Sequence, residues 1–250
     1  MTTSPVRGGA PSRVRILRMP IDVLTMNACM ERIGEFVQTD QPHLVVTADS
    51  SGIVQAQTDP ALAELYETAD LVTPDSSGVV WAMRRAGSPV PARVSGVDIV
   101  DNVCRVSSET GWRIYFLGAA PGIAELAAER MRLRHPGCNI VGARHGYFPQ
   151  ESDDVVAAEV AETKPDILFV AMGIPRQEKF IRATQDKIGA KVAMGVGGSF
   201  DVFSGKVRRA PVILQKIKME WLWRLALNPK KIGKVMLLPQ FVLMVLRERK

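Results

Sequence analysis

The sequence has few cysteines and no long apolar run, and each scarcity excludes a class of protein. Its 250 residues include three cysteines, Cys29, Cys104 and Cys138, which lie too far apart for a zinc motif or a disulfide framework. We therefore expect reduced, buried thiols. No stretch reaches the roughly 18 apolar residues that a transmembrane helix needs. Residues 1–13 lack the apolar core of a signal peptide and are expected to form a disordered leader.

Acidic residues are scarce at the end of the chain. Between Lys206 and Lys250 there are 12 lysines and arginines but only 2 acidic residues. The rest of the chain holds 20 basic and 24 acidic residues, so a mildly acidic body is followed by a strongly basic tail. Such an asymmetry points to an anionic partner, either a membrane surface or a nucleic acid.

Short apolar runs alternate with helix-length amphipathic stretches along the body. Six runs show little alternation of apolar and polar residues, which is typical of strands buried on both faces of a parallel sheet. They lie at His43–Ala48, Asp70–Thr73, Arg113–Gly118, Asn139–Gly142, Asp166–Gly173 and Lys191–Val196. Helices are expected between them, for example over 121–134, 152–163 and 175–187. The alternation predicts an α/β fold with a doubly wound, Rossmann-like, mostly parallel sheet over residues 14–205.

Glycine-rich or polar segments follow five of these expected strands. They read TADSSG at 47–52, TPDSSG at 73–78, GAAPG at 118–122, MGIPRQE at 172–178 and GVGGSFD at 195–201. Glycine lets a backbone approach a ligand, and free N–H groups at helix starts favour phosphate. Because ligands bind beyond the carboxyl ends of such strands, the five segments together predict a ligand site at this edge of the sheet.

Asp75 follows a proline at the expected end of a short strand and precedes a helix-like run. One interpretation is an aspartate that caps the helix or lies in its first turn. The other is a general base at the rim of a cleft, within hydrogen-bond reach of an attacking hydroxyl. The sequence leaves both interpretations open.

These segments and several others resemble the WecG/TagA/CpsF family of glycosyltransferases, in the family's order, from about Arg13 to Asn228. The resemblance rests on TADSSG at 47–52, DLVTPDSSGVVWAMR at 70–84, RVSGVD at 93–98, YFLGAAPG at 115–122, GYF at 146–148, KPDILFVAMGIPRQEKFI at 164–181, GVGGSFDVFSG at 195–205 and RAPVILQKIKMEWLWRL at 209–225. It implies an inverting transfer of a sugar, commonly N-acetylmannosamine or a related hexose, from a UDP-sugar to a polyprenyl-diphosphate-linked sugar. Such reactions belong to bacterial cell-wall and cell-surface polysaccharide synthesis.

The resemblance also implies roles for individual residues. It places the catalytic base on Asp75. Contacts with the donor are implied for Thr47, Arg93, Tyr147, Gln177 and Asp201, and Asp49 stands at a position usually near the sugar. Gly118, from the glycine-rich segment after its strand, is a further expected donor contact. The chain departs from the family pattern where Asp49 replaces a usual amide and Ser76 a usual glycine, so the identity of the donor sugar is open.

The departure of UDP leaves negative charge on a diphosphate, which Arg93, helix N-termini and backbone N–H groups could stabilise. No DxD pair is present to hold a divalent metal, and the three histidines show no spacing typical of a metal site or a triad. We therefore expect no metal and no cofactor, with the UDP-sugar as a substrate. Structural alternatives are a surface ion pair for Arg93, a solvated helix position for Gln177 and a core position for Tyr147.

The tail, residues 206–250, is predicted to form basic amphipathic helices that associate with a membrane. Its segment Val235–Leu246 is apolar except for Gln240. A length of 12 residues is too short to span a bilayer but suits a helix in the interface. Arg224, Lys231 and Lys234 are placed to meet the acceptor's diphosphate or anionic head groups. The alternative is a helical hairpin packed on the body or on another subunit of a homo-oligomer.

These observations predict a cytoplasmic protein, peripheral on the inner face of the plasma membrane. A non-catalytic, membrane-tethered nucleotide-binding module is the main alternative, and UDP binding without turnover would favour it. Nucleic-acid binding is disfavoured, because basic arms that bind nucleic acid are rarely as apolar as 235–246. A dinucleotide-dependent oxidoreductase is also disfavoured, because no GxGxxG follows an expected strand.

Overall fold

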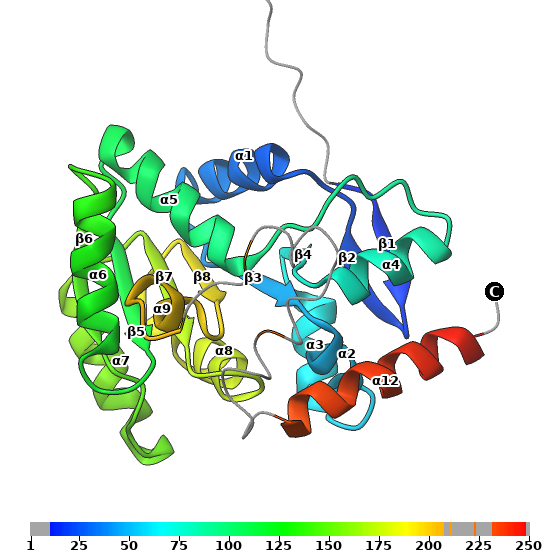
Figure 1. Cartoon of the computed structure of the whole chain (residues 1–250). Coiled ribbons are helices and arrows are strands. Elements are labelled where there is room, and N and C mark those ends of the chain that lie inside the picture. The colour runs from blue at the N-terminus through cyan, green and yellow to red at the C-terminus, as the bar shows by residue number, and fades with distance from the viewer. Residues whose placement is uncertain (1–10, 208–210, 212–222, 224–231, 249–250) are drawn as a thin grey trace, which may run out of the picture.

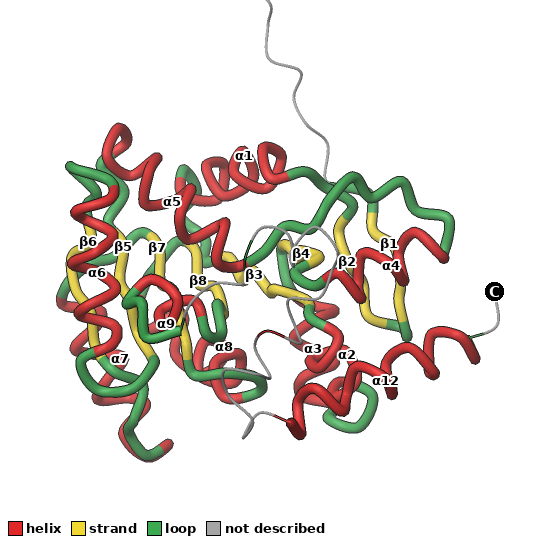
Figure 2. The backbone as a smooth tube through the Cα atoms, viewed as in Figure 1, coloured by secondary structure: helices red, strands yellow, loops and turns green. Residues whose placement is uncertain are grey.

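A six-stranded parallel sheet forms the centre of the chain, with helices on both faces (Figures 1 and 2). The computed structural model describes residues 11–207, 211, 223 and 232–248. The strand order is β4-β3-β8-β7-β5-β6. The strands are β3 (His43–Ala48), β4 (Leu71–Pro74), β5 (Ile114–Gly118), β6 (Ile140–Arg144), β7 (Ile167–Ala171) and β8 (Val192–Gly195). All six predicted strands and the predicted parallel α/β sheet are therefore confirmed.

The helices divide into two layers, and each layer buries its own apolar cluster against the sheet. One layer holds α2 (Ser50–Ala56), α3 (Pro60–Thr68), α4 (Ser77–Arg85), α7 (Asp153–Glu162), α8 (Arg176–Ile188) and α12 (Ile232–Arg247). The other holds α1 (Met26–Val37), α5 (Gly96–Thr110), α6 (Ile123–Arg134) and α9 (Ser199–Phe203). Burial on both faces explains why every residue of β5 and β7 is buried and why the strands read as continuous apolar runs. The three helices expected between the strands are confirmed as α6, α7 and α8.

Short polar side chains fix where the helices begin. In each of five helices, the residue before the first turn accepts a hydrogen bond from the backbone N–H three residues further on. These capping residues are Thr25, Asp49, Asp59, Ser76 and Ser95. Two of them, Asp49 and Ser76, lie in the polar segments that follow β3 and β4, so the caps also shape the carboxyl edge of the sheet.

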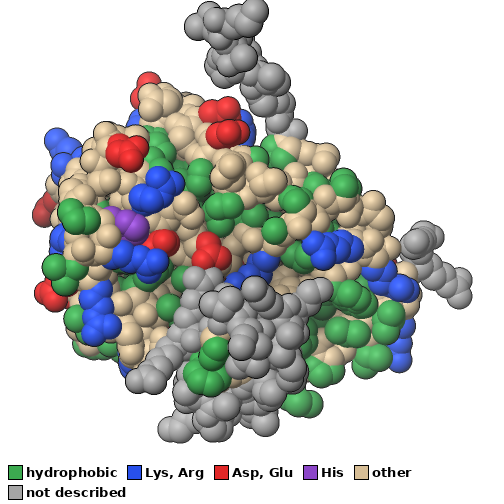
Figure 3. Space-filling model, turned by 45° about the horizontal axis from the view of Figure 1, so that its top comes forward, with side chains coloured by type: hydrophobic (Ala, Val, Ile, Leu, Met, Phe, Trp, Pro, Cys, Tyr) green, Lys and Arg blue, Asp and Glu red, His purple; other side chains and the backbone are tan. Residues whose placement is uncertain are grey.

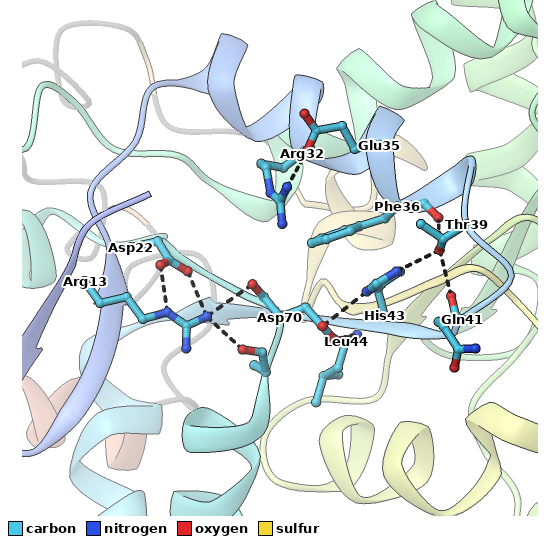
Figure 4. A network of polar contacts seen from close by, with 11 residues as sticks. Arg13, Asp22, Arg32, Glu35, Phe36, Thr39, Gln41, His43, Leu44 and Asp70 are labelled. Atoms are coloured by element: carbon cyan, nitrogen blue, oxygen red, sulfur yellow. Dashed lines mark hydrogen bonds and ion pairs between the residues drawn. The ribbon is translucent and has the colours of Figure 1, made fainter. Parts of the chain in front are cut away.

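An antiparallel hairpin, β1 (Arg13–Ile16) and β2 (Met19–Asp22), lies beside β4 and was not expected from the sequence. Asp22 is buried and accepts a hydrogen bond from Arg13 Nε at 2.8 Å (Figure 4). It accepts another from the backbone of β4, at Val72 N, at 2.7 Å. Arg13 also donates to the carbonyl of Ala69. These contacts attach the hairpin to the sheet. Arg13, the last residue of the expected leader, is thus the first residue of β1. Residues 1–10 lie outside the described part of the chain.

A polar network closes the amino ends of β3 and β4, opposite the glycine-rich segments. The Asp70 carboxylate accepts a hydrogen bond from Leu44 N at 2.9 Å and lies 3.2 Å from His43 Nδ1 (Figure 4). The His43 ring stacks on Phe36 with 4.1 Å between ring centroids. His43 therefore has a structural position far from the expected ligand site.

Helix α12 packs one face on the body of the chain, against α2 and α4. Phe241 and Val245 are buried in the same apolar cluster as these helices. Near the end of α12, Glu248 accepts a hydrogen bond from Leu17 N at 3.0 Å. The opposite face of α12 leaves Met236, Leu243 and Leu246 exposed. Of the two placements that the sequence left open, packing on the body thus holds for one face of this helix.

Other expectations for the tail fall mostly outside the described residues. Arg224 and Lys231 lie there, while Lys234 lies in the first turn of α12. Among the helices of the described ranges, none combines the length and the apolar character that crossing a bilayer requires.

Candidate active site

The chain leaves neighbouring strands in opposite directions at the carboxyl edge of the sheet. After β3 it enters α2 on one face, whereas after the adjacent β8 it enters α9 on the other face. The same divergence separates β7, followed by α8, from β5, followed by α6. Such switch points open a crevice beyond the strand ends. The four strand ends from β4 to β7 span about 14 Å at the usual spacing between strands, a distance suited to an extended ligand.

Asp75 lies at the carboxyl end of β4 and is half-buried. Its backbone N–H donates to the carbonyl of Ala48 at 2.9 Å, and its Oδ1 accepts from the backbone N–H of Gly96 at 3.1 Å. Ser76, not Asp75, caps α4, because Ser76 Oγ accepts from Val79 N. The interpretation of Asp75 as the cap of the following helix is therefore wrong. The carboxylate is oriented instead toward the start of α5, which follows β4 through the loop containing Arg93.

The loop before α5 brings Arg93 to the same corner. The N–H of Val94 donates to the carbonyl of Pro74 at 3.0 Å, which places the half-buried Arg93 beside the end of β4. The first residue of α5, Gly96, lies close to Thr47: a Cβ added to this glycine would stand 3.4 Å from Thr47 Cγ2. The ends of β3 and β4 and the start of α5 therefore meet around Asp75.

Thr47 and Asp49 frame the end of β3. Thr47 is buried, and its hydroxyl donates to the carbonyl of Gly195 at 2.9 Å, which ties β3 to β8. Asp49 caps α2: its Oδ1 accepts from Gly52 N at 2.6 Å and from Ser51 Oγ at 2.8 Å. Both hydrogen bonds use the same carboxylate oxygen, and the half-buried residue lies at the rim of the crevice.

Gln177 joins the loops that follow β7 and β8. Its Oε1 accepts from Gly173 N and from Gly197 N, each at 3.1 Å, and its Nε2 donates to Glu178 Oε1 at 2.7 Å. With 1% of its surface exposed, Gln177 is buried, so the interpretation as a solvated helix position is wrong. Gln177 fixes the spacing of two loops that border the crevice.

Gly118, Tyr147 and Asp201 complete the set of expected donor contacts. Gly118 ends β5 in tight contact with Ala171 of β7. The loop carrying Tyr147 folds over these strand ends, since Gly146 N donates to the carbonyl of Ala119 at 2.9 Å. Tyr147 is 71% exposed, so it is not a core residue and lies on the rim. Asp201 is half-buried in α9, directly beyond the loop that follows β8.

Sequence reasoning missed one polar residue beneath this edge. Tyr66 on α3 is 1% exposed, and its hydroxyl lies close to Gly52 at the start of α2. Burial, followed by the negative charges of Asp49, Glu178 and Asp75, raises the pKa of Tyr66 well above its usual range. A tyrosine in the amphipathic run of α3 carries no local signal that separates it from ordinary core residues, so only the tertiary structure reveals it.

Within the described residues, no three His, Cys, Asp or Glu side chains are grouped closely enough to hold a metal ion. Among the described residues, Arg93 is the arginine that the chain brings beside the end of β4. Arg176, in the first turn of α8, forms an ion pair with Asp153 and lies over the rings of Phe148 and Phe180.

A parallel sheet with a carboxylate and an arginine at its carboxyl edge is typical of an α/β enzyme whose site lies beyond the strand ends. The sequence matches the model of the "Glycosyl transferase WecG/TagA/CpsF family" over residues 14–250. The chain belongs to this family, and the resemblance recognised from its motifs is confirmed. It is a glycosyltransferase, as the sequence predicted.

Curated relatives agree with this assignment. The chain is 32% identical over 241 residues to the N-acetylglucosaminyldiphosphoundecaprenol N-acetyl-beta-D-mannosaminyltransferase of Staphylococcus aureus strain MRSA252. The aligned residues make up 96% of this chain and 94% of the relative. The proteins of the same name from strains NCTC 8325 / PS 47 and COL show the same identity and coverage. Because the similarity spans almost the whole of both chains, it includes the strand ends and the tail.

Proposed function

We propose that this enzyme transfers N-acetylmannosamine or a related hexose, with inversion, from a UDP-sugar to a polyprenyl-diphosphate-linked sugar. The observation that supports this most directly is the position of Asp75, held by Gly96 N at the edge of the crevice beside the Arg93 loop. The names of the Staphylococcus aureus relatives specify a lipid-diphosphate-linked N-acetylglucosamine acceptor and a mannosaminyl group. The reaction therefore belongs to the synthesis of a bacterial cell-surface polysaccharide.

In the proposed reaction, the Asp75 carboxylate takes the proton of an acceptor hydroxyl. The hydroxyl oxygen forms a bond to the anomeric carbon of the sugar, on the face opposite to UDP. The bond from that carbon to the diphosphate oxygen breaks, and its electron pair leaves with UDP. Arg93 and backbone N–H groups at the strand ends stabilise the released charge. The charge is thus met by groups of the chain itself, and we propose that no metal or cofactor is required.

The proposed donor lies along the strand ends from β4 to β7. Its diphosphate faces Arg93, and its sugar lies near Asp75 and Asp49. Asp201 and Tyr147 border the crevice further along, where they could contact the nucleoside. Thr47, Gly118 and Gln177 shape the crevice through the contacts that hold β3, β5, β7 and β8 together.

Nucleotide binding tests this proposal. We expect UDP to stabilise the folded protein, because a ligand at 100 times its Kd contributes about 2.7 kcal/mol. GDP and NAD should give much smaller shifts in Tm, and EDTA should not alter the shift caused by UDP. Transfer is then measured with a polyprenyl-diphosphate-linked acceptor, with the anomeric configuration of the product determined by NMR. Equal shifts with all three nucleotides would contradict the choice of UDP.

We further propose that the enzyme is peripheral on the cytoplasmic face of the plasma membrane, bound through the outer face of α12. Met236, Leu243 and Leu246 form an exposed apolar row on this helix. Arg18 and Arg247 line a shallow hollow beside it. Figure 3 shows apolar and basic side chains next to each other at the lower right, on the side where α12 and α4 lie in Figure 1. This combination suits the surface of an anionic bilayer, where apolar burial and charge attraction act together.

Replacement of the three exposed apolar residues of α12 by serine tests this placement. Because the buried face of the helix is unchanged, the fold should be retained. If each of the three side chains is half inserted into the bilayer, its replacement costs about 1 kcal/mol of binding free energy. Together the three replacements predict roughly 100-fold weaker binding to anionic vesicles. Co-sedimentation with anionic and neutral vesicles, at low and high salt, measures the effect. Leu133→Ser/Val155→Ser, which removes exposed apolar side chains elsewhere, is the matched control, and equal loss in both variants would argue against α12.

A further inference from the structure

A buried hydroxyl lies beneath the proposed donor site with no hydrogen-bond partner in the described part of the chain. It belongs to Tyr66, whose ring is packed in the apolar cluster under α2 and α3. Buried tyrosine hydroxyls usually have a partner, so one without a partner calls for an explanation. None of the roles described above uses this group.

The hydroxyl reaches the space that Gly52 leaves open. A Cβ at this glycine would stand 2.6 Å from Tyr66 Oη, 3.0 Å from Ile174 Cδ1 and 3.4 Å from Asp49 Oδ1. The phenol therefore ends between the loop after β3 and the loop after β7, directly below the rim. Tyr66 Oη and Asp49 Oδ1 therefore both lie within 3.4 Å of the Cβ position at Gly52, although they are not hydrogen-bonded to each other.

The surroundings favour a neutral phenol that donates its proton. Asp49, Glu178 and Asp75 are the carboxylates that act on it, and together with burial they keep the hydroxyl protonated. Glu178 is 2% exposed and its Oε1 accepts from Gln177 Nε2 at 2.7 Å, so this carboxylate lies too deep to meet a sugar at the rim. Asp49 accepts hydrogen bonds from Gly52 N and Ser51 Oγ through Oδ1, and it lies at the rim, where a sugar hydroxyl could bind. Asp49 is therefore the acceptor that best suits the phenol.

We propose that Tyr66 is a positioning residue for the donor sugar and acts through Asp49. When Asp49 turns toward a hydroxyl of the sugar, the Tyr66 hydroxyl donates a hydrogen bond to its carboxylate and fixes its orientation. Tyr66 does not contact the substrate. The proposal rests on the function proposed above, because it requires a UDP-sugar at this edge.

Tyr66→Phe removes the hydroxyl without breaking any described hydrogen bond, so Tm should not fall. We expect the affinity for UDP to be unchanged and the affinity for the UDP-sugar to fall roughly tenfold, since a hydrogen bond to a charged group is lost. Isothermal titration with UDP and with a UDP-sugar separates the two effects. Tyr115→Phe, which alters another buried tyrosine, should leave both affinities unchanged. A purely structural role would shift Tm or both affinities together, and would overturn the proposal.

A double-mutant cycle tests whether Tyr66 acts through Asp49. Asp49→Asn retains an oxygen to cap α2 but replaces the second acceptor oxygen. If the proposal holds, Asp49→Asn/Tyr66→Phe binds the UDP-sugar no more weakly than Asp49→Asn alone, because interacting residues are not additive. Additive losses would show that Tyr66 acts by another route and would overturn it.

A second pair of variants distinguishes the hydroxyl's role from its volume. Gly52→Ala places a methyl group against Tyr66 Oη and should lower Tm. Adding Tyr66→Phe should restore Tm but not the affinity for the UDP-sugar, whereas restoration of both would overturn the proposal. If the wild-type enzyme binds no UDP-sugar, the proposed function fails and this inference fails with it. If the wild type binds the donor and Tyr66→Phe binds it equally well, only this inference fails.

Discussion

Asp75→Asn is expected to lower the rate of sugar transfer roughly 10²–10⁴-fold, the usual effect of losing a general base. Asparagine retains an oxygen that can accept from Gly96 N, so the hydrogen bond at 3.1 Å can persist. An amide cannot take the proton of the acceptor hydroxyl. The fold and the affinity for UDP should therefore be unchanged. Single-turnover transfer to a lipid-linked acceptor, together with UDP titration and Tm, measures these quantities.

Asp59→Asn is the matched control for this variant. Asp59 caps α3 and forms an ion pair with Lys179 at 2.9 Å; that hydrogen-bonded lysine lowers the pKa of Asp59. It lies outside the crevice, and asparagine caps helices as well as aspartate does. Asp59→Asn should retain transfer activity. If Asp75→Asn behaves in the same way, Asp75 is not the base and the proposed mechanism is wrong.

Gly118→Ala is expected to destabilise the protein by more than about 4 kcal/mol, a loss typical of severe backbone conflict. Gly118 has φ of +137°, a region that only glycine adopts readily, and a Cβ there would stand 2.5 Å from the backbone C and O of Ala171. Ala171 ends the interior strand β7, which is paired on both sides, so its backbone has little room to move aside. Urea unfolding should show the loss, and the variant should accumulate in insoluble form if the loss exceeds the stability of the protein.

Gly122→Ala separates the contact from the dihedral strain. Gly122 also has a positive φ, +78°, but no atom lies within 4 Å of its added Cβ. This control should lose only about 1–2 kcal/mol. A Gly118→Ala protein that is as stable as the control, yet has lost affinity for UDP, would mean that Gly118 contributes through the donor and not through the packing of β5 on β7.

Local sequence was sufficient for the elements of the sheet. The six strands could be predicted because a strand covered by helices on both faces must be apolar at successive positions. The β1–β2 hairpin could not, because its two strands of four residues are short and mixed in polarity. What holds it to the sheet is the pairing of Asp22 with Arg13 and with Val72 N. That last contact joins residues 50 positions apart, which no local pattern reveals.

The motifs likewise identified which residues belong to the site, but their environments were decided by the fold. The spacing around Asp75 allowed a cap or a base, and the structure assigned the cap to Ser76 because the chain turns so that Asp75 meets Gly96. Helical periodicity left Gln177 as a surface candidate. The crossover from β7 to β8 instead buries it between two loops.

The sequence by itself determined the sheet, the family and the segments that form the carboxyl edge, because burial and turn chemistry act over a few neighbouring residues. Only the tertiary structure decided that α12 buries Phe241 while leaving Leu243 exposed, and that the Tyr66 hydroxyl ends beside Gly52 and Asp49. These contacts depend on how distant helices pack across the sheet. That packing is set by the path of the whole chain, and the spacing of residues within any one segment does not encode it.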